Sequence, residues 1–188
     1  KEPEHIRKMY GLDGGPAAKF GQICLLARGM VERGVRFVHL YNSDWDAHAD
    51  CDSNHRDNAR KTDIPLAALI EDLKQRGLLE STLIVCAGEF GRTPMMQGKE
   101  GRDHNPYGFS VLMAGGGIKG GKVIGATDDI GFRAVEDKVH IHDLHATMLE
   151  LLGLDHRKLH VTVSGLEKRL TGLGEEGQNS IAKRLMAG

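Results

Sequence analysis

Carboxylate and imidazole side chains gather in the stretch from Ser43 to Asp52. Asp44 and His48 have an Asp-x-x-x-His spacing, and Asp46 and His48 have an Asp-x-His spacing. Oxygen and nitrogen donors of this kind bind divalent cations such as zinc or manganese. Either spacing can converge on one ion if the chain coils here, so the sequence predicts a metal site. The alternative is a solvated acidic loop.

A second polar stretch adds two further candidate metal ligands, Glu89 and His104. Glycines flank the Glu89–Phe90 pair, which lets a ligand project where the backbone comes close. Arg92 and Arg102 carry guanidinium groups that can hold an oxyanion such as phosphate or sulfate through two parallel N–H donors. We therefore expect both arginines to bind substrate. The alternative is a surface turn with an ordinary Glu–Arg pair.

Each polar stretch follows a short apolar segment, and the first of these segments is rich in β-branched and aromatic residues. These segments, 35–41 and 82–87, are predicted to be buried strands. The polar stretches themselves, 42–58 and 88–106, are expected to be loops at the strand ends. A third strand is expected over residues 109–114, before a run of glycines.

Apolar residues at intervals of three and four predict amphipathic helices around these strands. The predicted helices span 17–33, 64–76 and 139–152, and the first two end at Gly34 and Gly77. Alternating strands and helices predict an α/β fold in which a sheet is covered by helices on both faces. Ligands of such sheets bind beyond the carboxyl ends of the strands, where both polar loops are expected to lie.

The bulk composition is that of a globular domain. The 188 residues are 40% hydrophobic and 27% charged, and their formal net charge is -1. We expect one domain over residues 1–188, with no overall field that attracts nucleic acid or an anionic membrane. No run of 18 apolar residues predicts a membrane span. An exposed turn is expected over 172–180, before a short last helix. Because the chain opens on Lys1 and not on Met, we expect it to be part of a longer protein.

Four motifs together resemble a known protein family. They are Trp45-Asp46-Ala47-His48, Gly88-Glu89-Phe90-Gly91-Arg92-Thr93-Pro94, Gly101-Arg102-Asp103-His104-Asn105 and His142-Asp143-Leu144-His145-Ala146-Thr147. They closely resemble the bacterial family known as domain of unknown function 1501, which is similar to sulfatases and alkaline phosphatases. The resemblance runs from about residue 5 to 160. It implies an alkaline-phosphatase/sulfatase-like fold, of which this chain is the C-terminal part.

The resemblance also implies roles for the candidate ligands. Enzymes of the wider superfamily hold one metal ion with an Asp-x-x-x-His string and a later histidine, and Asp44, His48 and His104 match that set. The Trp-Asp-x-His string of the family makes Asp46 the other candidate carboxylate. A second ion is normally held by an Asp-His-Gly string. Here Glu89 keeps the carboxylate of that string, and Phe90 stands in place of its imidazole.

The function implied by the resemblance is metal-dependent hydrolysis of sulfate or phosphate esters. The cofactor expected is a divalent metal, zinc first, with manganese or calcium as alternatives, and the substrate is an anionic ester or a sulfated saccharide. In the superfamily the nucleophile lies on an earlier strand, so we expect the parent protein to be the enzyme and this chain alone to be inactive. Similar proteins, abundant in planctomycetes, often begin with a twin-arginine export signal, which implies a periplasmic or secreted parent.

Two other interpretations of the same residues stay open. One is a degenerate, non-catalytic relative that binds an anionic ligand, such as a sulfated polysaccharide, or a partner protein; the replacement of an imidazole by Phe90 motivates it. The other is a structural α/β domain that binds no metal.

Overall fold

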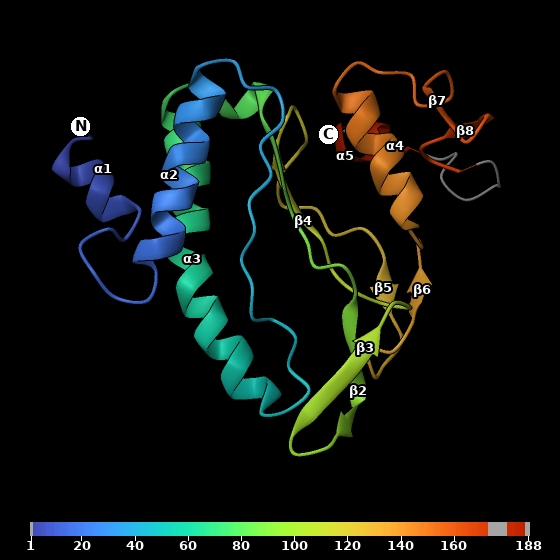
Figure 1. Cartoon of the computed structure of the whole chain (residues 1–188), viewed down its shortest axis with the longest axis horizontal. Coiled ribbons are helices and arrows are strands. Elements are labelled where there is room, and N and C mark those ends of the chain that lie inside the picture. The colour runs from blue at the N-terminus through green and yellow to red at the C-terminus, as the bar shows by residue number, and fades with distance from the viewer. Residues whose placement is uncertain (1, 173–179, 187–188) are drawn as a thin grey trace.

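The computed structural model describes residues 2–172 and 180–186, and it has a helical side and a strand-rich side. Helices α1 (Glu4–Met9), α2 (Ala18–Glu32) and α3 (Cys51–Gln75) pack together at one side of the molecule (Figure 1). A long extended segment leads from the end of α2 to the start of α3 and runs between these helices and the strands. The mixed α/β class predicted from the sequence is confirmed.

The helices end where glycine allows the chain to turn. Gly34 follows α2 with φ 82°, and Gly77 follows α3 with φ 68°. The next amide in each case donates to a carbonyl five residues back: Val35 N to Met30 O at 3.1 Å, and the equivalent bond after α3 at 2.8 Å. This pattern satisfies the last free carbonyls of a helix and needs a left-handed residue, which glycine adopts without strain. The predicted ends of both helices are confirmed.

Helix α3 begins earlier than predicted. It starts at Cys51 and not at Ile64, so the second half of the predicted loop 42–58 is helical. The residues before Ile64 are almost all polar, and the apolar period that indicates a helix is absent from them. Tertiary contacts stabilise this polar N-terminal half of α3 instead. Asn58 is 1% exposed, and its side chain donates to the backbone carbonyl of Asp44 in the preceding segment.

The hydrophobic core lies where the first three helices meet. Its buried members are Ile6, Tyr10, Cys24, Ala68, Leu69 and Leu73. Asp72 is buried beside this core and accepts hydrogen bonds from the Tyr10 hydroxyl at 3.0 Å and from Arg28 Nε at 2.9 Å. Burial raises the pKa of Tyr10, and the neighbouring Asp72 carboxylate raises it further. The core therefore joins apolar packing to a buried ionic network.

The described strands form separate antiparallel pairs. They are β1 (Leu83–Cys86) with β4 (Leu112–Gly115), β2 (Gly91–Gln97) with β3 (Gly101–Asn105), β5 (Ala126–Thr127) with β6 (Ala134–Glu136), and β7 (His160–Val163) with β8 (Leu166–Arg169). The predicted strands 82–87 and 109–114 correspond to β1 and β4. The expectation of one sheet covered by helices on both faces was wrong, because each described pair forms a two-stranded sheet that is not hydrogen-bonded to another pair.

Two local predictions also failed. The segment 35–41 is extended but, within the described residues, it belongs to no strand ladder, and Phe37 and Tyr41 are 66% and 76% exposed. Only its inward side chains, such as that of Leu40, reach the helical core. The stretch 88–106, predicted to be a loop, contains the β2–β3 hairpin. Its strands are polar, so apolar content gave no sign of them.

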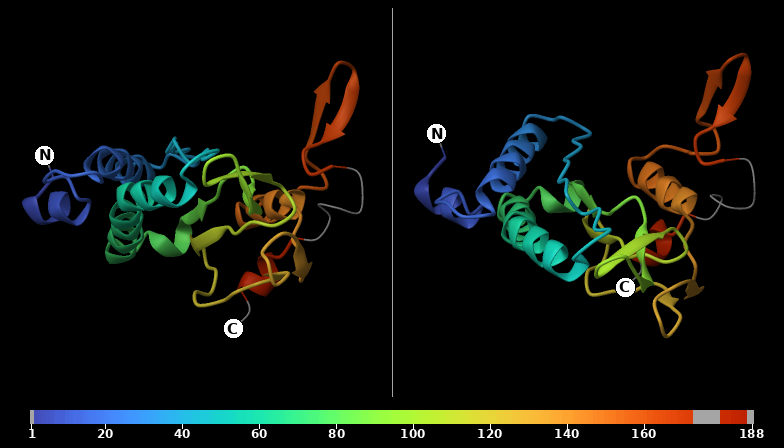
Figure 2. Two further views of the ribbon diagram at one scale, coloured as in Figure 1. Left: turned by 90° about the horizontal axis from the view of Figure 1, so that it is seen from below. Right: turned by 60° about the horizontal axis from the view of Figure 1, so that its bottom comes forward.

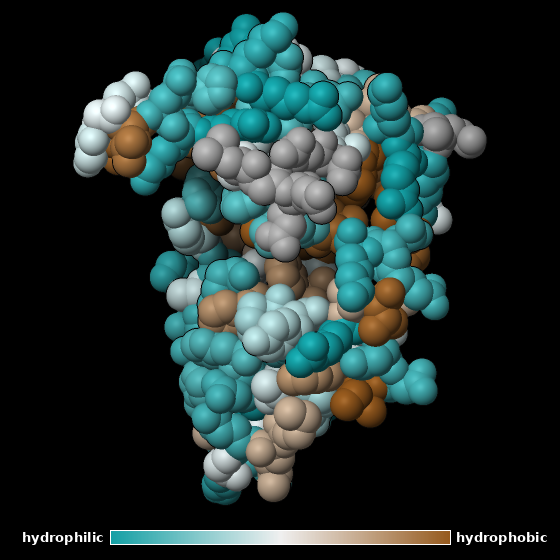
Figure 3. Space-filling model, turned by 90° about the vertical axis from the view of Figure 1, so that its right-hand side faces the viewer, coloured by the Kyte–Doolittle hydropathy of each residue, from teal (hydrophilic) through white to brown (hydrophobic). Residues whose placement is uncertain are grey.

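The C-terminal part contains α4 (Ile141–Leu151), the β7–β8 hairpin and α5 (Ala182–Met186). Helix α4 lies within the predicted helix 139–152, and a short helix, α5, follows as expected. The turn predicted over 172–180 falls largely outside the described residues. The β7–β8 hairpin projects from the body (Figure 2), and the face on that side is mainly hydrophilic with separate hydrophobic spots (Figure 3). None of the described helices is long and apolar enough to cross a membrane.

Candidate metal centre

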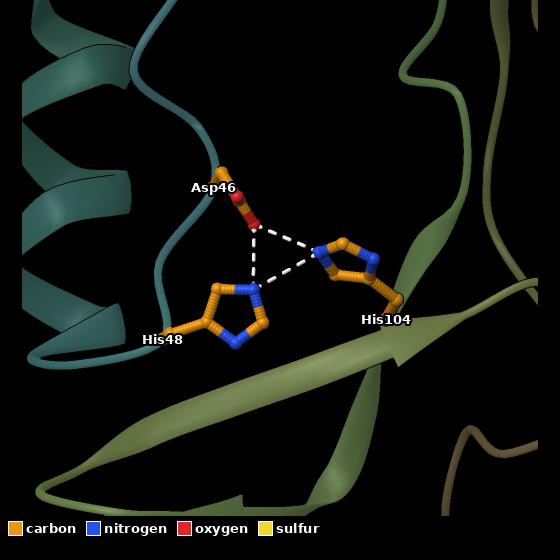
Figure 4. A group of neighbouring side chains, drawn as sticks. All are labelled: Asp46, His48 and His104. Atoms are coloured by element: carbon orange, nitrogen blue, oxygen red, sulfur yellow. Dashed lines mark hydrogen bonds and ion pairs between the residues drawn. The ribbon is translucent and has the colours of Figure 1, made fainter.

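Three polar side chains converge on one point between the extended segment and the β2–β3 hairpin (Figure 4). His104 Nε2 lies 2.9 Å from Asp46 Oδ1 and 3.0 Å from His48 Nε2, and His48 Nε2 lies 3.1 Å from the same Asp46 oxygen. Asp46 and His48 come from the segment that precedes α3, and His104 comes from β3. The three ligand atoms thus form a nearly equilateral triangle.

Backbone contacts between distant parts of the chain bring these side chains together. The Arg102 amide donates to Ala47 O at 3.1 Å, and Cys51 N donates to Glu100 O at 2.9 Å. Gly101 lies so close to the segment that an added Cβ would stand 1.9 Å from His48 O. Only glycine fits such an approach. Gly101 therefore allows the hairpin to deliver His104 to a pair of ligands more than fifty residues earlier.

Arg92 fixes the carboxylate of the cluster. Its Nη2 lies 2.6 Å from Asp46 Oδ1, and its guanidinium also donates to the carbonyls of Trp45 at 3.4 Å and Arg102 at 3.3 Å. The hydrogen bond from Arg92, followed by the one from His104, lowers the pKa of Asp46 from 3.8 to about 2. Asp46 therefore stays ionised to a lower pH than an ordinary aspartate, and the ionised form is the one that binds a cation.

The other predicted ligands lie outside this group. Asp44 has a left-handed backbone with φ 78°, and its carbonyl accepts from the side chains of Asn54 at 2.9 Å and Asn58 at 2.6 Å. Asp44 lines a separate cavity of about 230 Å³ together with Lys19 and Lys61. Of the two carboxylates that the spacing left open, the structure places Asp46 with the two imidazoles.

Glu89 and Arg102 likewise stay apart from the triangle. Glu89 is exposed just before β2 and does not join the group of described residues that could share one ion. Arg102 donates from Nη1 to Thr93 O at 2.9 Å and lines a cavity of about 340 Å³ beside the start of α3. Of the two predicted oxyanion-binding arginines, Arg92 touches the cluster itself, and Arg102 is directed into the hairpin and its cavity.

The donor set and its openness fit a divalent cation. The separations of 2.9–3.1 Å are close to the roughly 3.3 Å between two ligands of a tetrahedral zinc ion. The side chains of Asp46, His48 and His104 are 61%, 43% and 42% exposed. Catalytic zinc sites use three protein ligands and keep a position open for water or substrate, whereas structural sites are closed by four. The arrangement therefore offers three donors to one ion and leaves one side of it open.

One contact of the cluster was missed from the sequence. Gln97, the last residue of β2, lies with its amide oxygen 2.7 Å from His48 Nδ1. Its role was hidden because the hairpin was not predicted. The signal that marks the hairpin is the Gly98-Lys99-Glu100-Gly101 string, in which Gly98 and Glu100 both have φ 55° and make the turn between the strands.

A family model described as "Protein of unknown function (DUF1501)" matches residues 1–181 of the chain. No curated protein and no solved structure matches it. The family match confirms the resemblance drawn from the four motifs. It carries no information on sulfatases or alkaline phosphatases.

Proposed function

We propose that this chain, which belongs to the DUF1501 family of proteins of unknown function, carries the metal centre of a metal-dependent hydrolase of sulfate or phosphate esters. The observation that supports this function is the open triangle of Asp46, His48 and His104. Two imidazoles and one carboxylate with a free side are the ligand set of hydrolytic zinc sites.

Each residue of the triangle has a defined part in this proposal. Asp46 supplies an anionic oxygen, and the hydrogen bond from Arg92 holds that oxygen in place and lowers the pKa of the carboxyl. His48 and His104 supply imidazole nitrogens as ligands, which favour zinc over calcium because calcium prefers oxygen ligands. A divalent cation at such a site supplies Lewis-acid chemistry, since it polarises an ester oxygen and lowers the pKa of water.

The ester class rests on the resemblance of the four motifs to the DUF1501 family and on the expected likeness of that family to sulfatases and alkaline phosphatases. Arg92 lies on the same hairpin as His104 and contacts Asp46, so it is the cation of the proposed site that an anionic ester can reach beside the metal ligands. A substrate oxyanion at Arg92 has to share the guanidinium with Asp46. The same resemblance leads us to propose that the parent protein works in the periplasm or outside the cell.

Metal binding is the first test of this function. The chain is titrated with Zn²⁺, Mn²⁺ and Ca²⁺ by calorimetry, and the metal content is measured after dialysis. We expect one zinc ion per chain and a loss of affinity of at least about 100-fold in His104→Ala, because one of three ligands is removed. His160→Ala, which removes an exposed imidazole from β7, is the matched control. A wild-type chain that binds none of the three ions contradicts the proposal.

Turnover is the second test. The natural protein that contains this sequence is assayed on 4-nitrophenyl sulfate and 4-nitrophenyl phosphate with each ion supplied. We expect hydrolysis of at least one ester that disappears in His104→Ala and after chelation. If neither ester is hydrolysed while zinc is bound, the site is a metal site but the ester-hydrolase assignment is wrong.

A second candidate function is a non-catalytic anion-binding protein. It is favoured by Glu89 and Phe90, which stand where the resemblance expects the ligands of a second ion. Glu89 lies outside the cluster, and the Phe90 ring stacks against His104 with 4.1 Å between ring centres. This candidate predicts binding of a sulfated polysaccharide such as heparin without turnover. That binding should be unaffected by His48→Ala, whereas the hydrolase loses its ester turnover in the same variant.

A further inference from the structure

Gln97 determines which nitrogen of His48 is free. Its amide oxygen lies 2.7 Å from His48 Nδ1. An amide oxygen only accepts hydrogen bonds, so the ring must carry its proton on Nδ1. The neutral ring then keeps its lone pair on Nε2, the atom that faces Asp46 and His104 at 3.1 and 3.0 Å. In the other tautomer Nε2 carries a hydrogen and cannot bind a cation.

The position of Gln97 relative to His48 is set by the same backbone contact that brings His104 to the site. Gln97 is the cross-strand partner of Gly101 in the β2–β3 hairpin. Gly101 in turn lies against the His48 carbonyl, and the neighbouring Arg102 amide donates to Ala47 O. The Gln97 side chain is therefore placed by β-sheet register and not by a flexible loop.

Phe90 acts on the second imidazole. Its ring lies 4.1 Å from the His104 ring, centre to centre, with 32° between the planes. Phe90 precedes β2, and His104 pairs across the hairpin with Arg92, so both rings stand at the same end of the ladder. A stacked ring restricts rotation of the imidazole and keeps its Nε2 toward Asp46 at 2.9 Å.

We propose that Gln97 and Phe90 are positioning residues that set the tautomer of His48 and the ring orientation of His104 for a divalent cation. This inference rests on the metal-dependent function proposed above. It gives Phe90 a role of its own, because a ring that cannot bind a metal can still orient one that does. Neighbours that hold metal-binding histidines in this way typically affect affinity by 10- to 100-fold.

Zinc affinity tests the role of Gln97. The chain competes for Zn²⁺ with a chromophoric chelator, and we expect binding about 10- to 100-fold weaker in Gln97→Leu. Gln97→Glu keeps an accepting oxygen and should stay within a few fold of the wild type. Gln75→Leu makes the same change on the exposed end of α3 and should leave the affinity unchanged. A Gln97→Leu chain that binds zinc as tightly as the wild type overturns the role of Gln97.

The stacking role of Phe90 predicts a smaller effect. Phe90→Leu should weaken zinc binding by about 2- to 10-fold, the range expected for loss of one aromatic pair. Phe90→Tyr keeps the ring and should restore wild-type affinity. Phe37→Leu, at a position that is 66% exposed in the extended segment, is the matched control. Equal affinities of the leucine and tyrosine variants at position 90 overturn the role of Phe90.

A tautomer measurement separates positioning from a general effect on folding. In the metal-free chain, ¹⁵N NMR of the imidazole nitrogens should show His48 with its proton on Nδ1, and Gln97→Leu should show a mixture of tautomers while thermal unfolding stays unchanged. A wild-type His48 with its proton on Nε2 overturns the inference alone. A wild-type chain that binds no zinc overturns the proposed function and the inference together.

Discussion

Asp72 in the helical core and Asp46 beside the hairpin are both carboxylates held by arginine, but they lie in opposite surroundings. The Asp72 side chain is 2% exposed and accepts from Tyr10, Arg28 and Arg76, the last at 2.6 Å. The Asp46 side chain is 61% exposed, and its near neighbours besides Arg92 are two imidazoles.

The difference shows what separates a structural ion pair from a candidate binding site. A buried carboxylate surrounded by protein donors is closed to an outside ligand, and its charged partners lose a counter-charge if it is removed. An exposed carboxylate beside imidazoles can exchange its contacts for a cation at little cost, since water already solvates the pair. Stability should therefore depend on Asp72, and metal affinity should depend on Asp46.

The largest effect is expected for the buried carboxylate. Asp72→Asn removes the buried counter-charge that Arg28 and Arg76 share, although both arginines still pair with Glu32. We expect a loss of about 3 kcal/mol in the free energy of unfolding, at the low end of the range for breaking a buried ion pair. Urea denaturation measures it. Asp57→Asn, which breaks an exposed pair with Arg60, should cost less than about 0.5 kcal/mol. Similar losses in the two variants would contradict the distinction between the regions.

The converse is expected for Asp46. Asp46→Asn should reduce zinc affinity by at least about 100-fold, equivalent to about 2.7 kcal/mol, because an anionic ligand becomes a neutral one. The free energy of unfolding in the absence of metal should change by less than about 1 kcal/mol. Zinc titration and urea denaturation of the same sample measure both quantities. A variant that is strongly destabilised but binds zinc normally would reverse the assignment.

A smaller effect is expected at the edge of the buried network. Tyr10→Phe removes one donor to Asp72 but leaves both arginines in place, so we expect a loss of about 1–2 kcal/mol.

The pH dependence of stability at Tyr10 follows from its raised pKa. Because folding raises that pKa above its ordinary 10, the neutral hydroxyl stabilises the fold below pH 10, and this contribution is lost as the pH rises further. Urea denaturation from pH 8 to 11 should show a decline in the wild type that is shallower in Tyr10→Phe. Identical profiles would show that the hydroxyl is not coupled to folding.

The smallest effect concerns the ionisation of Asp46. Arg92→Gln removes the hydrogen bond that contributes most to the low pKa, so the pKa should rise from about 2 toward 3.8. A ¹³C NMR titration of the Asp46 carboxyl carbon from pH 1.5 to 6 measures the shift. Arg133→Gln is the control, because the Arg133 guanidinium lies over the Tyr107 and Phe132 rings; this variant should leave the pKa of Asp46 unchanged. A pKa that stays near 2 without Arg92 would assign the effect to the imidazoles.

Local features of the chain were predictable because their energetics are local. Gly34 and Gly77 end helices in a left-handed backbone conformation, which residues with a Cβ atom rarely adopt. A glycine after an apolar helical period therefore marks the helix end in the sequence. Helix α4 begins within the predicted range 139–152, where the Asp143 carboxylate accepts from the His140 amide at 3.0 Å, a capping contact within one turn. Asp46, His48 and His104 were recognisable as candidates from their side-chain chemistry.

Pairings between distant segments were not predictable in this way. The β2–β3 hairpin is polar, so no apolar alternation marks it, and the segment 35–41 looks like a buried strand although the described residues offer it no ladder partner. Periodicity reports how a segment partitions between core and solvent, and it does not identify the neighbour with which the segment pairs.

The sequence by itself determined where α2 and α3 end, the family and the residue types that can bind a cation. Only the tertiary structure decided between Asp44 and Asp46, left Glu89 apart and brought Gln97 and Phe90 to the two imidazoles. The physical reason is that Asp46 and His104 lie 58 residues apart, so their meeting depends on a backbone contact at Gly101. The spacing of residues within one segment cannot predict that contact.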